Sequence, residues 1–214
     1  MIAAVVVVVV VSASFGGGKP LPLEPAAAAG SLAPAPPAGP IGPEGVSIPA
    51  AQALAPAGGL VAGETVDGIS CEPLERLAYH IHVHLTVFVN GAARRIPYGI
   101  GIAAPRTGTR TPSGFFVTSG SCFSWLHTHA SDGIIHIESP SPRTYTLGDF
   151  FDVWHQPLGA NRVGPFRGHV VAFYNGRDYA GNVRQIPLRK HAQVQLVVGK
   201  PLIAPETITF PAGL

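Results

Sequence analysis

Apolar and polar residues alternate with a period of two from Leu77 to Val89, and three histidines are interleaved with the aliphatic residues. This alternation predicts a β-strand with one aliphatic face turned toward a core. Asn90-Gly91 follows at once, and this dipeptide is typical of a two-residue hairpin turn. The apolar run 170–174 meets Asn175-Gly176 in the same way, which predicts a second hairpin.

Further short strands are expected at 123–128, 134–138 and 194–198. A helix should interrupt them, because Thr146 and Asp149 form a capping-box pattern ahead of an apolar stripe with helical spacing. The sequence therefore predicts a mainly β fold, a small antiparallel β-barrel or β-sandwich, with one short helix.

The first residues form a separate segment. Residues 2–11 are continuously apolar and end at the small residues Ser12-Ala13-Ser14, as in a secretory signal peptide. Lys and Arg are missing ahead of the run, so an uncleaved membrane anchor is the alternative, although the run is shorter than the roughly 20 residues of a membrane span. We therefore assign residues 1–15 to a signal peptide or membrane anchor. We expect an exported protein, extracellular, in the cell envelope or periplasmic, and tethered to the membrane if the segment is kept.

Residues 16–66 are rich in Ala, Pro and Gly, which predicts a disordered linker because such a segment has little apolar surface to bury. Only four residues before position 67 are charged, namely Lys19, Glu24, Glu44 and Glu64. Residues 67–214 contain all nine histidines and both cysteines, and their length suits a single domain.

The charge of the chain excludes one class of partner. Charged residues make up 12% of the sequence, the net charge is +2, and the basic residues form no run that could follow a phosphate backbone. We therefore expect no nucleic-acid partner, and membrane contact only through the N-terminal segment. Phosphate-binding loops, dinucleotide fingerprints and serine nucleophile elbows are also missing, so the candidate chemistry rests on the histidines.

The histidines recur at two-residue spacing on three predicted strands. His80, His82 and His84 would share one strand face, His127 and His129 another, and His136 and Glu138 a third. Residues i and i+2 lie about 6.6 Å apart, so two imidazoles at this spacing can reach one ion at about 2.0–2.1 Å. The ends of the triple lie about 13 Å apart, so either one of its members only supports the site or there are two ions.

We predict a transition-metal site. The expected ligands are His82, His84, His127, His129 and His136, with Glu138 orienting a ligand or moving a proton. His80 is expected to be left out, because it lies nearest the domain boundary. Copper or zinc is favoured, and iron or nickel also suits imidazole ligands. The alternatives are a pH-responsive cluster and unrelated surface histidines.

Four segments carry a resemblance: 80–84 (HIHVH), 125–129 (WLHTH), 133–140 (GIIHIESP) and 146–151 (TLGDFF). Together they resemble a family of uncharacterised exported bacterial and archaeal proteins, which implies export but no defined activity. The HxH pair followed by a carboxylate is also similar to the cupin metal motif. Glu138 lies nine residues after His129, farther than in that motif, so the likeness concerns the site alone.

Cys71 and Cys122 are the only cysteines, and an exported chain would meet an oxidising compartment, so we expect them to form a disulfide. A pair of buried thiols and metal ligation by Cys122 are the alternatives. Two functions stay open at this stage. The domain is either a metalloenzyme with redox or hydrolytic chemistry, or a non-catalytic protein that carries or scavenges metal, and the sequence pattern names no substrate.

Overall fold

The structure is a computed structural model, and it describes residues 31–214. The predicted signal peptide or anchor at residues 1–15 lies outside the described residues. Within 31–214, no helix combines the length and the hydropathy that a membrane-spanning helix needs.

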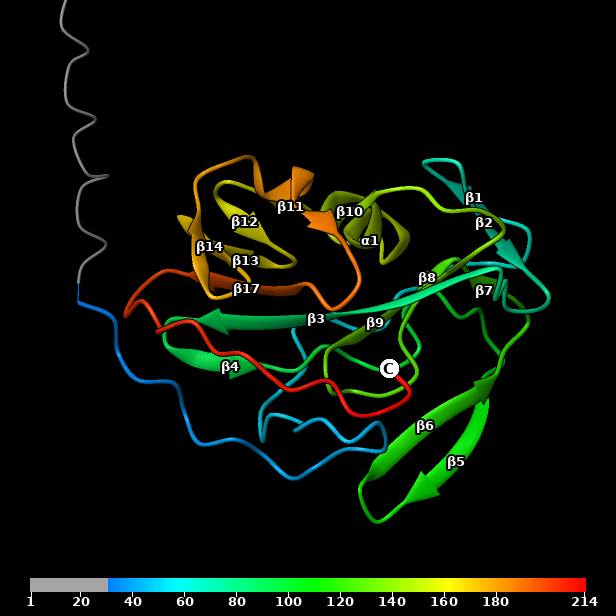
Figure 1. Cartoon of the computed structure of the whole chain (residues 1–214), viewed down its shortest axis with the longest axis horizontal. Helices are drawn as coiled ribbons and strands as arrows, with labels where there is room; N and C mark the ends of the chain where they lie inside the picture. The colour runs from blue at the N-terminus through cyan, green and yellow to red at the C-terminus, as the bar shows by residue number, and fades with distance from the viewer. Residues whose placement is uncertain (1–30) are drawn as a thin grey trace, which may run out of the picture.

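The centre of the fold is a seven-stranded sheet (Figure 1). Its strands run in the order β15 (Arg177–Tyr179), β14 (Val170–Tyr174), β17 (Gln193–Val198), β3 (Tyr79–Val89), β9 (Ile134–Ser139) and β8 (Leu126–His127), and β4 (Ala92–Arg94) pairs with β3. The predicted mainly β fold is confirmed. The finer prediction of a small antiparallel barrel or sandwich is not confirmed, because the described strands do not return from β8 to β15 and because β17 is parallel to β3.

Shorter strands form four small sheets around this centre. They are β1 (Thr65–Val66), β2 (Ile69–Glu72) and β7 (Phe123–Ser124); β5 (Thr107–Thr111) and β6 (Gly114–Ser119); β10 (Tyr145–Thr146) and β16 (Pro187–Leu188); and β11 (Leu158–Gly159), β12 (Arg162–Val163) and β13 (Phe166–Arg167). A short 3-10 helix, η1, spans Val183–Gln185.

Both predicted hairpins are present. Asn90 and Gly91 join β3 to β4 with φ of 50° and 79°, and Asn175 and Gly176 join β14 to β15 with φ of 51° and 75°. Positive φ at both central residues is what a type I′ turn requires, and Asn-Gly adopts it at little cost.

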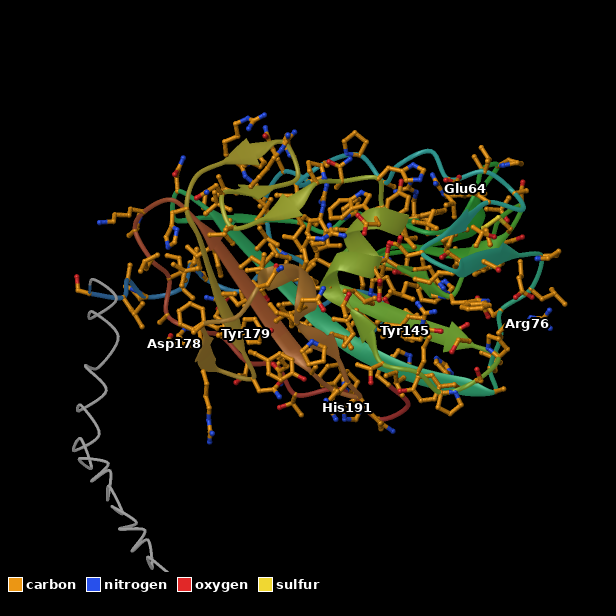
Figure 2. The ribbon with its side chains drawn as sticks, turned by 90° about the horizontal axis from the view of Figure 1, so that it is seen from above. Glu64, Arg76, Tyr145, Asp178, Tyr179 and His191 are labelled. Atoms are coloured by element: carbon orange, nitrogen blue, oxygen red, sulfur yellow. A yellow bond between two sulfur atoms is a disulfide. The ribbon has the colours of Figure 1, made fainter. Side chains whose placement is uncertain are left out.

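The predicted helix is α1 (Leu147–Val153), and the capping box of Thr146 and Asp149 is formed. Phe150, Phe151 and the following Trp154 are buried in the main core. Figure 2, viewed from above, shows α1 lying over the sheet. The helix therefore covers one face of the sheet, as its apolar stripe predicts.

The two faces of β3 have different surroundings. Ile81, Val83 and Leu85 belong to the main core under α1. The histidines of β3 alternate with them and belong to the opposite face, where Phe88 packs with Ile203 in a second apolar cluster. Figure 1 shows the two ends of the described chain and the β5–β6 hairpin on this second side.

Residues 31–66 differ from the disordered linker that their composition predicts. Leu54 and Leu60 are buried, and Leu54 N donates a hydrogen bond to Arg95 O. Ala33 pairs with Ile203 in a parallel bridge. A few well-placed aliphatic side chains and strand-like hydrogen bonds therefore attach this segment to the domain, although most of it lacks regular secondary structure. Residues 16–30 lie outside the described residues.

Cys71 and Cys122 form the predicted disulfide, with their Cα atoms 5.4 Å apart. The pairing of β2 with β7 brings the two residues together. The alternatives of free thiols and of a Cys122 metal ligand are therefore wrong for this structure.

Candidate metal centre

Three histidines lie in register across three neighbouring strands. His82 on β3 is paired with His136 on β9, and His136 is paired with His127 on β8. The adjacent row consists of Ile81, Ile137 and Leu126, which turn into the main core. Because successive residues of a strand point to opposite faces, burying the aliphatic row gathers the histidines on the other face.

Two groups of side chains come close enough to hold an ion. His127, His129, His136 and Glu138 are buried, and their donor atoms lie within 4.8 Å of one another. His80, His82 and His136 form a second group by the same criterion, so His136 belongs to both. The structure thus brings together all the predicted site residues except His84.

The loop before β5 holds the segment that carries His127 and His129. Ser124 N donates to Gly101 O, and Thr128 N donates to Ile100 O. At Gly101, with φ of 68°, a Cβ atom would lie 2.1 Å from the carbonyl oxygen of Leu126. Only glycine therefore allows the two backbones to approach this closely.

The imidazoles of His127 and His129 have defined tautomers. Nδ1 of His127 donates to Ser124 O at 2.8 Å, and Nδ1 of His129 donates to Val117 O at 2.6 Å. A carbonyl oxygen only accepts, so in each neutral ring the proton is on Nδ1 and Nε2 carries a lone pair. The two Nε2 atoms lie 3.0 Å apart. Two lone pairs therefore face each other, and a cation that binds both would satisfy them.

The electrostatics of the pair agree with this assignment. Burial lowers the pKa of His127 well below its usual value, and the neighbouring His129 and His136 lower it further. Burial also lowers the pKa of His129. Both rings are therefore neutral near pH 7, and protonation does not resolve the contact between their lone pairs.

His136 is held from its other side by Glu44. Its Nε2 donates to Oε1 of Glu44 at 2.6 Å, which leaves Nδ1 to face Nε2 of His82 at 3.2 Å and Oε1 of Glu138 at 3.5 Å. A carboxylate that accepts from the remote nitrogen of a ligating histidine fixes its tautomer and makes it a stronger ligand. Burial lowers the pKa of His136, but hydrogen bonds with Glu138 and Glu44 outweigh this effect and raise it to about 9.

Asp132 is a second buried carboxyl group beside Glu44. Burial and then the charge of Glu44 raise the pKa of Asp132 to about 8. Oδ2 of Asp132 and Oε2 of Glu44 are buried and have no hydrogen-bond partner among the described residues. A proton on Asp132 therefore relieves the repulsion between two buried carboxylates.

A cavity of about 690 Å³ opens over the imidazoles. Its lining includes His80, His129 and Glu75, together with the last residues of the chain, 211–214. Oε1 of Glu75 lies 3.4 Å from Nε2 of His129, and burial raises the pKa of this carboxyl group. The candidate ligands are thus buried in the protein but face a space large enough for a small molecule.

His84 differs from its prediction as a ligand. Its Nε2 contacts Asp132 O at 3.0 Å, and its Nδ1 lies 3.5 Å from the hydroxyl of Thr86. Both nitrogens thus have protein partners, and neither candidate group within residues 31–214 includes this side chain. His80, which we expected to be left out, belongs to the second group instead.

Sequence reasoning missed two carboxylates. Glu44 lies in the segment assigned to a linker, and the available signal was its position as an isolated charge among Pro, Gly and aliphatic residues. Glu75 has no such signal. His155 contacts Glu64 and His191 contacts Leu214 O, and both lie outside the two groups.

The chain matches no protein-family profile, no curated protein and no solved structure. The resemblance to a family of exported proteins therefore stays a prediction. The centre has to be interpreted from its own geometry.

Proposed function

We propose that this protein binds a transition-metal ion through His127, His129, His136 and Glu138. The observation that carries the proposal is the convergence of four buried donor atoms within 4.8 Å, with histidine tautomers that direct lone pairs inward. Without an ion, this arrangement would bury polar atoms that oppose one another, which costs free energy.

Two distances within this group fit a coordination shell. With metal–nitrogen bonds of about 2.0–2.1 Å, two ligands of one ion lie about 2.9–3.3 Å apart at angles from square to tetrahedral, and at most about 4.2 Å apart. The two Nε2 atoms of His127 and His129 are 3.0 Å apart. Oε2 of Glu138 lies 3.9 Å from Nε2 of His127, which is also within the limit. Three imidazoles and one carboxylate favour copper or zinc, with iron and nickel as further candidates.

The cavity favours a catalytic role for the ion. An ion in a catalytic site keeps a coordination position for water or substrate, and here such a position would face the cavity that Glu75 and His129 line. Glu138 and Glu75 are carboxyl groups beside that space, and both are suited to holding or moving a proton. We therefore favour a metalloenzyme with hydrolytic or redox chemistry.

A metal carrier is the second candidate. The exposed His80, which lines the cavity, favours it, because a surface ligand next to a buried set gives an ion a route in and out. The disulfide suits an oxidising compartment in either case, which supports an exported protein.

Metal analysis of the purified full-length protein tests the proposal. We expect copper or zinc to copurify, and zinc titration to show binding that falls at least 100-fold in His127→Ala/His129→Ala. His155→Ala is the control, because His155 contacts Glu64 and belongs to neither candidate group. Figure 2 labels Glu64 near the edge of the molecule. Equal zinc affinity of the wild type and the double variant would refute the site.

A further inference from the structure

The second group of histidines has the same geometry as the first. Nε2 of His80 lies 3.0 Å from Nε2 of His82, which in turn lies 3.2 Å from Nδ1 of His136. Both separations fall in the range of about 2.9–3.3 Å expected for two nitrogen ligands of one ion.

The three nitrogens of this group can all serve as ligands. Nε2 of His136 donates to Glu44, so Nδ1 is the nitrogen that faces His82 and that can bind an ion. In the metal-free centre Nδ1 of His136 can instead carry a proton, which it donates to His82 or Glu138. An ion bound to all three nitrogens would take the place of that proton.

Glu138 lies between the two groups. Its Oε1 is 3.0 Å from Nε2 of His80, whereas its Oε2 is 3.9 Å from Nε2 of His127 on the other side. Oε2 is buried and has no hydrogen-bond partner among the described residues. Oε1 of this carboxylate therefore faces His80 and Oε2 faces His127, as the two oxygens of a bridging carboxylate face two ions.

We propose that the centre holds two metal ions, one at His127 and His129 and one at His80 and His82, bridged by Glu138. This inference rests on the proposed function. His136 has a single free nitrogen, which lies nearest His82, so it serves the second ion when both are bound. Glu75, 3.4 Å from Nε2 of His129, then takes its place at the first ion.

The alternative is that His80 and His82 only support the first site, by holding Glu138 and His136 in position. The two cases differ in stoichiometry. A bridged pair requires two ions about 3.5–4 Å apart, whereas supporting residues change the affinity for one ion but not the number bound.

Copper titration of the metal-free full-length protein, followed by electron paramagnetic resonance, distinguishes them. We expect two Cu²⁺ per chain in the wild type, with magnetic coupling that removes or broadens the signal of isolated Cu²⁺. His80→Ala/His82→Ala should bind one Cu²⁺ and give the full signal of an isolated ion. His84→Ala is the matched control, because His84 is a buried histidine on the same face of β3, and it should still bind two.

The outcomes separate this inference from the proposed function. One uncoupled Cu²⁺ in the wild type would overturn the two-ion centre and leave the first site standing. Two ions in both the wild type and His80→Ala/His82→Ala would also overturn it. No bound Cu²⁺ in the wild type would refute the proposed function itself. The wild-type measurement decides the matter even if the double variant does not fold.

Discussion

Glu44 is the carboxylate that fixes the orientation of His136, and its removal should weaken metal binding without removing a ligand. We expect Glu44→Ala to lower zinc affinity about 10- to 100-fold, the usual effect of losing the partner of a ligating histidine. Glu44→Gln should recover part of the affinity, because its amide oxygen can still accept from Nε2 of His136. Competition titration with a coloured zinc chelator measures both. Wild-type affinity in Glu44→Ala would show that Glu44 does not position the ligand.

The different partners of His80 and His84 could not be predicted from the sequence of β3 alone. The alternation of apolar and polar residues along β3 correctly places both histidines on one face of the strand. Their partners differ because the register places Glu138 opposite His80 and Ile134 opposite His84. The register depends on long-range pairing between β3 and β9, which the local pattern of β3 does not specify.

At the scale of an element, the packing of residues 31–66 on the domain could not be predicted from their composition. Their composition predicts disorder, since most of the segment has little apolar surface to bury. Composition averages over positions, however, and Leu54, Leu60 and Val46 are buried in the structure. The same segment carries Glu44 to His136, so the attachment of the segment and the integrity of the candidate site are linked.

Substituting Leu54 tests this attachment. The side chain is 2% exposed and packs in the main core, so we expect Leu54→Ala to lower the free energy of unfolding by about 3 kcal/mol. Leu32→Ala is the matched control in the same segment, because that side chain is 43% exposed and should change stability by about 0.5 kcal/mol or less. Urea unfolding of both variants gives the comparison. Equal stabilities would mean that the segment does not pack on the domain in solution.

At the scale of the whole molecule, the sequence predicts the elements better than their arrangement. The two Asn-Gly hairpins, the capped helix α1 and the disulfide follow from local signals and are present. The parallel pairing of β17 with β3 joins segments more than 100 residues apart, and it brings both hairpins into one open sheet with β17 between them. Local patterns carry no information on such pairing, so the sequence left the choice between a barrel and a sandwich open and did not predict the parallel pair of strands.

The disulfide and the metal centre should stabilise the molecule independently. Cys71 and Cys122 are 51 residues apart, and closing a loop of this length stabilises the folded state by about 4 kcal/mol on the chain-entropy model. Their side chains lie in a small apolar cluster with Leu60 and Ala103, and neither cysteine belongs to the candidate metal groups. We therefore expect Cys71→Ala/Cys122→Ala to lose about 4 kcal/mol of unfolding free energy, in urea unfolding of the metal-free protein.

Zinc should stabilise the wild type and this variant equally, because a ligand that binds only the folded state adds about 2.7 kcal/mol at 100 times its dissociation constant. The two contributions add if the sites share no partner. The test therefore compares four unfolding curves, for each protein with and without zinc. Stabilisation of the wild type alone would show that the disulfide holds the centre in place. Ser124 would make this connection, because it lies two residues after Cys122 and its carbonyl oxygen accepts from Nδ1 of His127. Equal stabilisation would instead show that the paired strands β3, β9 and β8 are sufficient to align the ligands.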